Sequence, residues 1–329
     1  MGRRYVAEIG PGEIIESQTF LVLNKDLRTT NQGSLYIHAV LGDRTGQIVA
    51  RAWSASEAMY NIMPRGGLIN VKGRSESYKG NLQFIIEAIR PVDGDTVDLA
   101  EFLPATDGDV EEMWSRVTKV LATIKDPAIR ALVDAFVADE QKMKAFRTAP
   151  AARDMHHAYI GGLLEHTMNV LEMAQLVAPR YRELNADLVL AGVFLHDLGK
   201  TAELGYSTNF EYTDEGQLLG HIAICAQWIG EMADRVAQSS GKPFPTRTRW
   251  LLQHIVLSHH GKMEFGSPKT PAIPEAFAVH FLDNLDAKVV MAIRAIKEDR
   301  DADANWTGFH RGLETRVYKA GIGKNEGQA

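Results

Sequence analysis

The sequence is poorest in cysteine, and it lacks long apolar runs. Cys225 is its only cysteine, which excludes an intramolecular disulfide and a cysteine-based zinc site and is typical of a reducing compartment. No stretch reaches the roughly 20 apolar residues that a membrane helix needs. The first residues, Met1 to Pro11, carry charges where a secretory signal would be apolar. We therefore expect a cytoplasmic protein with no membrane partner.

Positive charge is in the minority, but it is unevenly distributed. The net charge of −6 argues against indiscriminate nucleic-acid binding by the whole chain. Residues 1–92 carry 11 basic and 8 acidic side chains, whereas the remainder carries 25 and 34. This division fits a nucleic-acid surface in the first part and carboxylates gathered for metal ions in the second. The length of 329 residues suffices for two domains.

The first 92 residues show the pattern of short strands and turns. Apolar and β-branched runs, several alternating with period two, are separated by turn sequences such as Asp43-Arg44-Thr45-Gly46. A short helical stretch, residues 54–61, falls between the third and fourth runs. This order predicts an all-β, five-stranded OB barrel. The expected strands are Phe20–Leu23, Ser34–Leu41, Gly46–Trp53, Gly67–Ser77 and Asn81–Ile89.

Aromatic and basic side chains interleave on these strands. Exposed rings stack on bases of any sequence, at about 1 to 3 kcal/mol per base, although rings on barrel strands also fill barrel interiors. Tyr78, which precedes Lys79 in a turn, is the best candidate for an exposed ring. We expect this domain to bind single-stranded nucleic acid, either RNA or DNA. The candidate contacts are Arg28, Tyr36, Arg51, Trp53, Arg74, Tyr78 and Lys79.

A polar linker follows the strands. Residues 93–109 are rich in Asp and Gly, and beyond them apolar residues recur at spacings of three and four. We expect helices over Val110–Ile124 and Pro127–Phe146. The predicted organisation is a barrel over residues 1–92, a linker over 93–109, an all-α domain over 110–320 and a frayed tail over 321–329.

A histidine and an aspartate end the apolar run Leu188–Leu195. His196 and Asp197 are followed by Lys200. Imidazole with carboxylate suits a divalent transition ion, and a carboxylate can bridge two ions. Such a pair alone is more often a helix cap or a buried hydrogen bond, but further candidates favour a metal site. These are His166, His221, His259, His260 and Asp283.

Two choices stay open among these candidates. Asp283 lies in a largely apolar helix, where a carboxylate must be paired or bound to metal. Asp286, three residues later, shares that face and competes for the same role. The sequence favours Asp283. It does not decide whether His259, His260 or both are ligands.

The order of these residues resembles a known family. His166, then His196-Asp197, then Asp283 matches the pattern of the HD phosphohydrolase superfamily. From about Phe20 to Lys319 the chain is similar to the YhaM-type 3′→5′ exoribonucleases. The similar segments are Leu27–Thr30, Asp43–Gly46, Gly161–His166, Phe210–Gly216, Leu257–Gly261, Glu264–Pro268 and Leu282–Lys288.

The resemblance implies an OB domain that holds a single strand and a helical HD domain that cleaves it from the 3′ end. Mn²⁺ is the favoured cofactor, with Fe²⁺, Co²⁺, Mg²⁺ and Zn²⁺ as alternatives. Two ions about 3.5 to 4 Å apart can hold a hydroxide for attack on phosphorus. The resemblance implies that His166, His196, Asp197 and Asp283 bind the first ion. Asp197 would bridge to the second ion, which His221 and one or both of His259 and His260 would also bind. Lys200 would contact a phosphate oxygen.

We therefore predict stepwise release of 5′-nucleoside monophosphates from single-stranded RNA, with single-stranded DNA as a second substrate to test. Two alternatives remain: a nucleotide or cyclic-dinucleotide hydrolase, which has no obvious need of an OB barrel, and a strand-binding protein with a structural or vestigial metal site. The turn Asn31–Leu35 is less basic than the resemblance implies, which bears on strand affinity. The oligomeric state is open, a homo-oligomer included.

Overall fold

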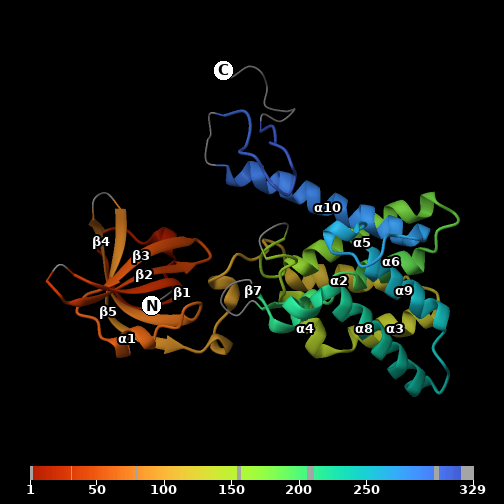
Figure 1. Ribbon diagram of the computed structural model, residues 1–329, viewed down its shortest axis with the longest axis horizontal. Helices are drawn as coiled ribbons and strands as arrows, with labels where there is room; N and C mark the ends of the chain where they lie inside the picture. The colour runs from red at the N-terminus through yellow and green to blue at the C-terminus, as the bar shows by residue number, and fades with distance from the viewer. Residues whose placement is uncertain are drawn as a thin grey trace. The chain divides into compact units, whose positions relative to one another are not determined.

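The computed structural model describes residues 3–30, 32–78, 81–153, 157–205, 211–299 and 304–319. These form two units, one up to Ala105 and the other from Thr106 onwards. Figure 1 shows the first as a β-barrel and the second as a bundle of helices. The prediction of an OB barrel followed by a helical domain is confirmed. None of the described helices combines the length and the apolar character needed to cross a membrane.

The barrel is closed by one long strand. Strand β1 pairs with β2 through its second half and with β4 through its first half, both antiparallel. The strand order is β1-β2-β3-β5-β4, and β3 pairs with β5 in parallel. The strands are β1 (Ile14–Thr29), β2 (Leu35–Asp43), β3 (Gly46–Ala52), β4 (Leu68–Tyr78) and β5 (Asn81–Val92), with helix α1 (Glu57–Asn61) before β4.

Strand β1 is much longer than the run Phe20–Leu23 that the pattern predicts, so that expectation is wrong in its bounds. Register shifts between Ile15 and Gln18, and between Val22 and Asn24, interrupt the alternation of inward and outward side chains. A search for period two therefore finds only the middle of the strand. The rings of Phe20 and Phe84 are fully buried in the barrel core.

The helical unit is built around helix α6. This helix is buried along almost its whole length, and it packs against α5, α9 and α10. Its last residue is Leu195, so His196 and Asp197 follow directly in the interior of the unit. The helices of the helical unit are α2 (Val110–Leu121), α3 (Pro127–Val137), α4 (Glu140–Thr148), α5 (Gly162–Val177), α6 (Ala186–Leu195), α7 (Lys200–Glu203), α8 (Asp214–Ser240), α9 (Thr246–Ser258) and α10 (Pro274–Glu298). The unit also contains the two-residue strands β6 (Leu204–Gly205) and β7 (Glu211–Tyr212).

The helical stretch expected over Pro127–Phe146 is divided into α3 and α4. The carboxylate of Asp139 accepts a hydrogen bond from the Lys142 amide and so begins a new helix. Apolar residues keep their spacing across this break, and periodicity alone does not reveal it. Short 3₁₀ turns complete the fold at Val6–Glu8, Gly94–Thr96, Leu99–Glu101, Ala178–Arg180 and Met263–Phe265.

Candidate metal centre

Four candidate ligands converge from α5, the end of α6 and α10. The Nε2 atom of His166 lies 3.2 Å from Nε2 of His196 and 3.3 Å from Oδ1 of Asp283. Oδ2 of Asp197 lies 3.4 Å from Nε2 of His196 and 3.8 Å from that of His166. Atoms that bind one ion at about 2.0–2.2 Å are separated by about 3.0 to 3.5 Å. The separations of 3.2 to 3.8 Å are close to this range, so these four atoms are candidates for the ligands of one ion.

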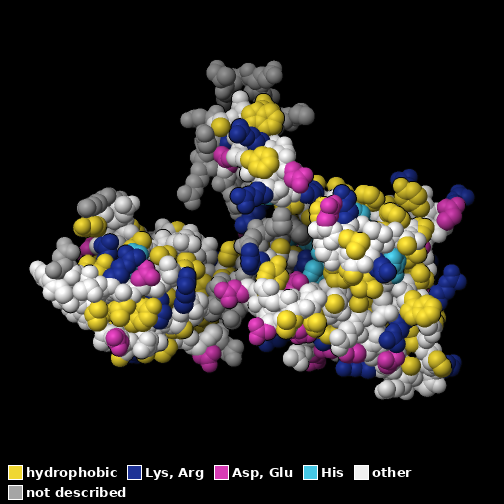
Figure 2. Space-filling model, in the orientation of Figure 1, with side chains coloured by type: hydrophobic (Ala, Val, Ile, Leu, Met, Phe, Trp, Pro, Cys, Tyr) yellow, Lys and Arg dark blue, Asp and Glu magenta, His cyan; other side chains and the backbone are white. Residues whose placement is uncertain are grey.

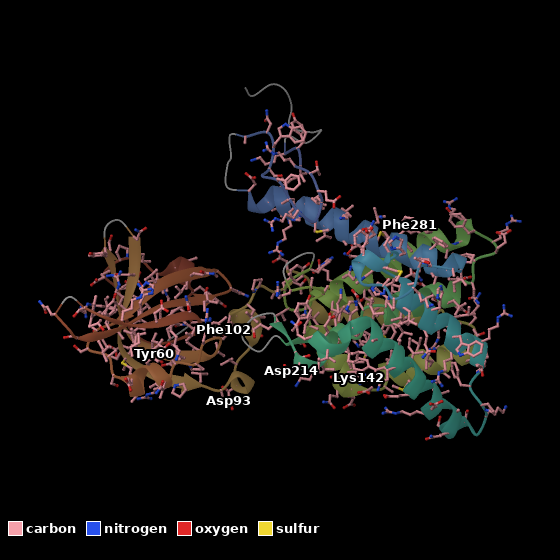
Figure 3. The ribbon with its side chains drawn as sticks, viewed as in Figure 1. Tyr60, Asp93, Phe102, Lys142, Asp214 and Phe281 are labelled. Atoms are coloured by element: carbon pink, nitrogen blue, oxygen red, sulfur yellow. The ribbon has the colours of Figure 1, made fainter. Side chains whose placement is uncertain are left out.

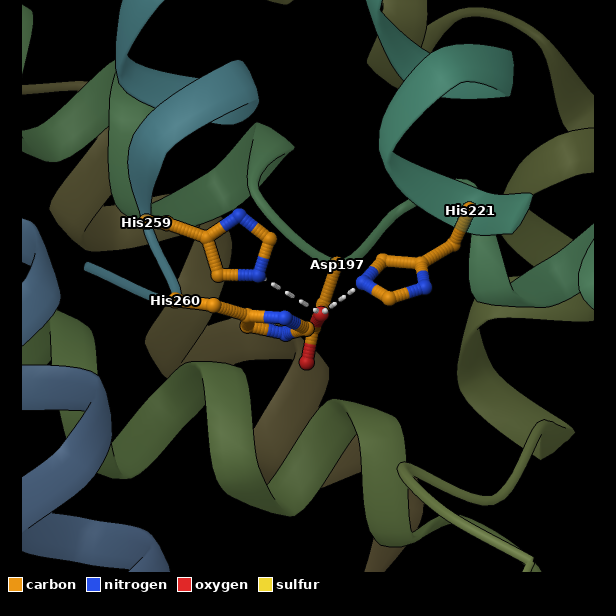
Figure 4. Close-up of side chains that lie close together, drawn as sticks. All are labelled: Asp197, His221, His259 and His260. Carbon is orange, nitrogen blue, oxygen red and sulfur yellow. Dashed lines mark ion pairs between the residues drawn. The ribbon is translucent and has the colours of Figure 1, made fainter. Parts of the chain in front are cut away.

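The other oxygen of Asp197 faces a second group of histidines (Figure 4). Oδ1 lies 3.4 Å from Nε2 of His221 and 3.6 Å from Nε2 of His259. His260 completes this group, in which one ligand atom from each residue lies within 4.8 Å of the others. Asp197 is thus placed between two sets of imidazole nitrogens, with one carboxylate oxygen toward each.

The second group contains buried atoms that lack a hydrogen-bond partner. Among the described residues, Oδ1 of Asp197 and the Nε2 atoms of His221 and His259 have none. Leaving such an atom unsatisfied in a protein interior costs about 1 to 3 kcal/mol. A cation that accepts lone pairs from all three would remove this cost. The buried histidine and aspartate cluster therefore fits divalent metal ions.

Hydrogen bonds at Nδ1 orient the histidine rings for metal binding at Nε2. A ring that donates from Nδ1 keeps a lone pair on Nε2, which is the form that binds metal. Burial lowers the pKa of His196 to about 4 and that of His260 to about 3, so both rings are neutral at pH 7. The backbone acceptors, at 2.6 to 2.8 Å, are Val193 for His196, Val256 for His259 and Phe265 for His260.

His221 is held by a carboxylate and by glycines. Oε1 of Glu203 accepts hydrogen bonds from the backbone amide and from Nδ1 of His221, each at 2.9 Å. Gly220 kinks α8 immediately before His221 with a φ of 73°, a conformation that favours glycine. A Cβ atom on Gly199 would lie 2.2 Å from the His221 carbonyl oxygen. Sequence reasoning missed Glu203, whose only signal is an acidic side chain one helical turn after Lys200.

Lys200 supplies a positive charge beside the cluster. Its Nζ donates to Oδ2 of Asp197 at 2.6 Å, and both side chains are buried. Burial opposes the charged form, but the Asp197 carboxylate outweighs it and raises the pKa of Lys200. Burial would also raise the pKa of Asp197, yet Lys200 and the surrounding imidazoles hold it well below its usual value. The pair is therefore an ammonium ion and a carboxylate.

Asp283 and Asp286 contact opposite sides of the same histidine. Asp283 faces Nε2 of His166, whereas Oδ2 of Asp286 accepts from Nδ1 of His166 at 2.7 Å. A carboxylate behind an imidazole fixes its tautomer and orientation and makes it a stronger ligand. Asp283 thus lies on the Nε2 side of His166 and Asp286 on its Nδ1 side, which favours Asp283 as the candidate ligand.

His157 belongs to the same support and was missed by sequence reasoning. Its Nε2 lies 2.9 Å from Oδ2 of Asp286, and its Nδ1 lies 2.6 Å from the Tyr159 hydroxyl. Asn169 donates to the other oxygen of Asp286 at 3.1 Å. His157 is almost fully buried and has a positive φ of 48°. The only signal for it in the sequence is a pair of adjacent histidines.

Replacing Asp286 by alanine should weaken metal binding by about 10- to 100-fold, because His166 loses the group that orients it. Titration calorimetry with Mn²⁺ measures this change directly. Asp234→Asn is the matched control, since Asp234 is an exposed carboxylate on α8 that pairs with Arg249. Equal affinity of Asp286→Ala and the unmodified chain would show that Asp286 does not support the site.

The structure brings four of the seven candidate nucleic-acid contacts together on the outer surface of the barrel. The ring centroids of Tyr36 and Trp53 are 5.1 Å apart, and the Arg51 guanidinium lies 5.9 Å from the Trp53 ring and 5.3 Å from that of Tyr78. Trp53 and Tyr78 are about half exposed. We call these four residues the aromatic cluster. They lie on β2, on or next to β3 and at the end of β4, and the strand 2–3 face is where OB folds bind oligonucleotides.

Of the remaining candidates, Arg28 neighbours the aromatic cluster. Arg28 lies opposite Tyr36 in the β1–β2 ladder and forms an ion pair of 2.7 Å with Asp26. Arg74 is exposed on β4, where Glu87 lies 3.1 Å from it. Lys79 lies outside the described residues. Both described arginines are therefore partly neutralised by neighbouring carboxylates.

Comparison with known proteins agrees with this geometry. Residues 163–288, which include His166, the His196-Asp197 pair and Asp283, match the HD domain family. The 3′-5′ exoribonuclease YhaM of Halalkalibacterium halodurans is 35% identical over 287 residues, 87% of each chain. YhaM of a Geobacillus species is 36% identical over 289 residues, 88% of this chain and 86% of its own.

A solved structure resembles the barrel. The second OB-fold domain of replication protein A from Methanococcus maripaludis aligns over 28% of this chain and 96% of its own length, with 18% identity and a TM-score of 0.23. The family assignment depends on the two YhaM proteins, which match both units at well over 30% identity. The chain belongs to the family of the YhaM 3′-5′ exoribonucleases.

Proposed function

We propose that this chain is a metal-dependent 3′→5′ exoribonuclease that releases 5′-nucleoside monophosphates from single-stranded RNA. The observation that carries the proposal is the position of Asp197, whose two oxygens face separate groups of histidine nitrogens. Phosphodiester hydrolysis is a reaction for which proteins use two adjacent metal ions. The names of the YhaM relatives support RNA as the substrate and the 3′ end as the starting point.

The proposal assigns each group of ligands to one ion. Imidazole and carboxylate together suit transition ions, which favours Mn²⁺ and keeps Fe²⁺, Co²⁺ and Zn²⁺, along with Mg²⁺, as alternatives. Such ions lower the pKa of a bound water and neutralise phosphate charge. His166, His196, Asp283 and Oδ2 of Asp197 would hold the first ion, and His221, His259, His260 and Oδ1 of Asp197 the second.

The chain's own residues provide the remaining chemistry. The Lys200 ammonium, 2.6 Å from Asp197, can bind a nonbridging phosphate oxygen of the scissile linkage. Cys225 is no alternative nucleophile, because burial raises the pKa of its thiol and Sγ contacts the Leu195 carbonyl at 2.9 Å. Attack by water on phosphorus accounts for the reaction with no covalent enzyme intermediate.

The proposal assigns strand binding to residues 1–92 and hydrolysis to residues 110–320, with 93–109 as the link. Stacking of bases on Tyr36, Trp53 and Tyr78 tolerates any sequence, and Arg51 adds positive charge among these rings. Recognition of this kind suits an enzyme that must advance along a strand. It does not select RNA over DNA, so single-stranded DNA is the second substrate to compare.

A direct assay tests the proposed function. With Mn²⁺, a 5′-labelled single-stranded RNA should shorten in steps from its 3′ end, and 5′-monophosphates should accumulate. The same reaction with single-stranded DNA and with a cyclic dinucleotide defines the substrate class. Intact RNA with each of Mn²⁺, Mg²⁺, Co²⁺ and Zn²⁺ would contradict the proposal. Turnover of the cyclic dinucleotide alone would favour the small-nucleotide hydrolase.

Trp53→Ala should raise the KM for a long single-stranded RNA by roughly tenfold, because one stacked base is worth about 1 to 3 kcal/mol. The kcat/KM for a dinucleotide should stay the same, since a dinucleotide at the metal centre has no base left to stack on the barrel. Steady-state kinetics on both substrates separates these effects. Trp250→Ala is the control, because Trp250 is an exposed tryptophan on α9. An unchanged KM for the long strand would remove Trp53 from the binding surface.

A further inference from the structure

Helix α10 has apolar side chains on two opposite sides. One side, with Val279 and Leu282 buried, packs against α5, α6 and α9. The other exposes a large apolar side chain at almost every turn, and apolar surface of this extent is normally covered. Figure 3 labels Phe281 on this helix. The exposed residues are Phe277 (48%), Phe281 (62%), Leu285 (50%), Val289 (47%), Ile293 (48%) and Ile296 (37%).

Five of these side chains form a row with a constant spacing of four residues, from Phe277 to Ile293. We call this row the α10 ridge. In the view of Figure 2, hydrophobic side chains gather along the upper edge of the helical unit, where Figure 1 places α10. The ridge itself contains no charged side chain. An oligonucleotide needs basic groups along its path, so the ridge does not suit a nucleic acid.

The segment after α10 carries further exposed apolar side chains. Nζ of Lys288 donates to the Gly312 carbonyl oxygen, which fastens the segment to the middle of the helix. Lys319 forms an ion pair of 2.8 Å with Asp299 at the end of the helix. The segment contributes three more exposed rings, those of Trp306 (53%), Phe309 (63%) and Tyr318 (49%).

The exposed apolar area of α10 and the following segment is larger than a monomer usually leaves in water. A large aromatic side chain offers about 150 to 250 Å². The nine side chains on α10 and the following segment, each 37 to 63% exposed, therefore present on the order of 700 Å². A monomer rarely leaves more than a few hundred Å² of continuous apolar surface in water. Each partner in a standard interface buries about 800 Å².

The spacing of the α10 ridge is symmetric about Leu285. Rows of side chains four residues apart pack into the groove beside the same row of another helix, with the axes crossing at about −50°. A twofold axis at Leu285 places Phe281 near Val289 of a second copy, whereas Phe277 and Ile293 lie at the ends of the contact. The same surface then serves both partners, as a symmetric dimer contact requires. We propose that α10 is the interface between two copies of this chain, packed antiparallel around Leu285.

Light scattering coupled to size-exclusion chromatography tests the proposal on the full chain. The unmodified protein should have twice the mass of one chain, or the mass of a larger assembly that contains this pair. Phe281→Glu should halve that mass, because two charges would be buried in the contact. Leu218→Glu is the control, since Leu218 is 82% exposed on α8 and its substitution should leave the mass unchanged. A monomeric unmodified protein, or a Phe281→Glu protein of unchanged mass, would overturn the proposal.

A cysteine pair tests the position of the axis and does not depend on dissociation. Leu285→Cys places two thiols at the twofold axis, where their Cα atoms fall within the about 4.4 to 6.8 Å that a disulfide spans. Oxidised glutathione should convert this variant to a covalent dimer on a non-reducing gel. The Phe277→Cys variant should run as a single chain on the same gel, because the two copies of residue 277 lie at opposite ends of the contact. A covalent dimer through residue 277, or none through 285, contradicts the antiparallel arrangement.

Discussion

Asp197→Asn should lower RNA hydrolysis by at least about a thousandfold, because metal ions contribute several kcal/mol to phosphoryl transfer and each 1.4 kcal/mol is a factor of ten. Asparagine offers one neutral oxygen and one amide nitrogen that donates hydrogen. One group of histidines would therefore face a donor in place of a ligand. Single-turnover degradation of a 5′-labelled RNA with saturating Mn²⁺ measures the loss. Asp234→Asn, which removes an exposed carboxylate from α8, should retain full activity.

Metal stoichiometry separates loss of ligands from loss of fold. Asp197 borders both groups, so Asp197→Asn should impair the binding of both ions. His259 borders only the second group, and His259→Ala should therefore retain one ion. Circular dichroism confirms that each variant keeps its helices. Two tightly bound ions in Asp197→Asn, or activity within tenfold of the unmodified chain, would reject the bridging role.

Removal of divalent ions should abolish activity and lower the melting temperature of the helical unit. A ligand present at 100 times its Kd stabilises the folded state by about 2.7 kcal/mol. For a domain of this size, 1 kcal/mol corresponds to about 2 to 4 °C, so a loss of about 5 to 10 °C is expected. Differential scanning calorimetry of the chain with excess EDTA, and then with Mn²⁺ restored, tests both parts. If neither EDTA nor Mn²⁺ changed the melting temperature, the buried cluster would bind no metal.

A substitution in the barrel, Trp53→Ala, is the control for the removal of divalent ions. The aromatic cluster lies in the first unit, and its residues are not metal ligands. Trp53→Ala should therefore show the same response to EDTA as the unmodified chain. If the substitution altered that response, the two units could not be treated as separate in function.

The candidate ligands could be selected from the sequence because their residue types are rare in apolar surroundings. Asp197 and Asp283 are carboxylates within strongly hydrophobic segments, and His196 follows a helix that is almost entirely buried. Polar groups in such positions need a partner, whatever the fold. The convergence of α5, α6 and α10 on one point is a property of the three-dimensional structure, as is the placement of Asp283 and Asp286 on opposite sides of His166.

The supporting residues could not be predicted, because their roles depend on contacts between distant parts of the chain. His157 and Asp286 are 129 residues apart in sequence. His157 does not differ in type from a surface residue, and the helical spacing that makes Asp286 a candidate does not reveal its contacts with His157 and with Nδ1 of His166. Glu203 is similar, since its function depends on the kink at Gly220 that turns His221 toward it.

The barrel shows where pattern analysis reaches its limit. Its five strands could be counted from turns and alternation, but the bounds of β1 could not, because irregular pairing displaces the pattern along that strand. The same problem affects the aromatic side chains. Phe20 and Phe84 face the core while Trp53 and Tyr78 are half exposed, and composition does not separate these pairs.

The contact between Lys200 and Asp197 bears on how the centre is assembled. Because the ammonium already lies 2.6 Å from Oδ2, the ion-free protein does not expose a bare carboxylate to its apolar interior. We expect an incoming cation to displace this counter-charge, so that folding of the helical unit does not depend on metal. On the proposed function, the displaced ammonium becomes available to an anionic strand. The same lysine would then first pair with Asp197 and later contact the substrate.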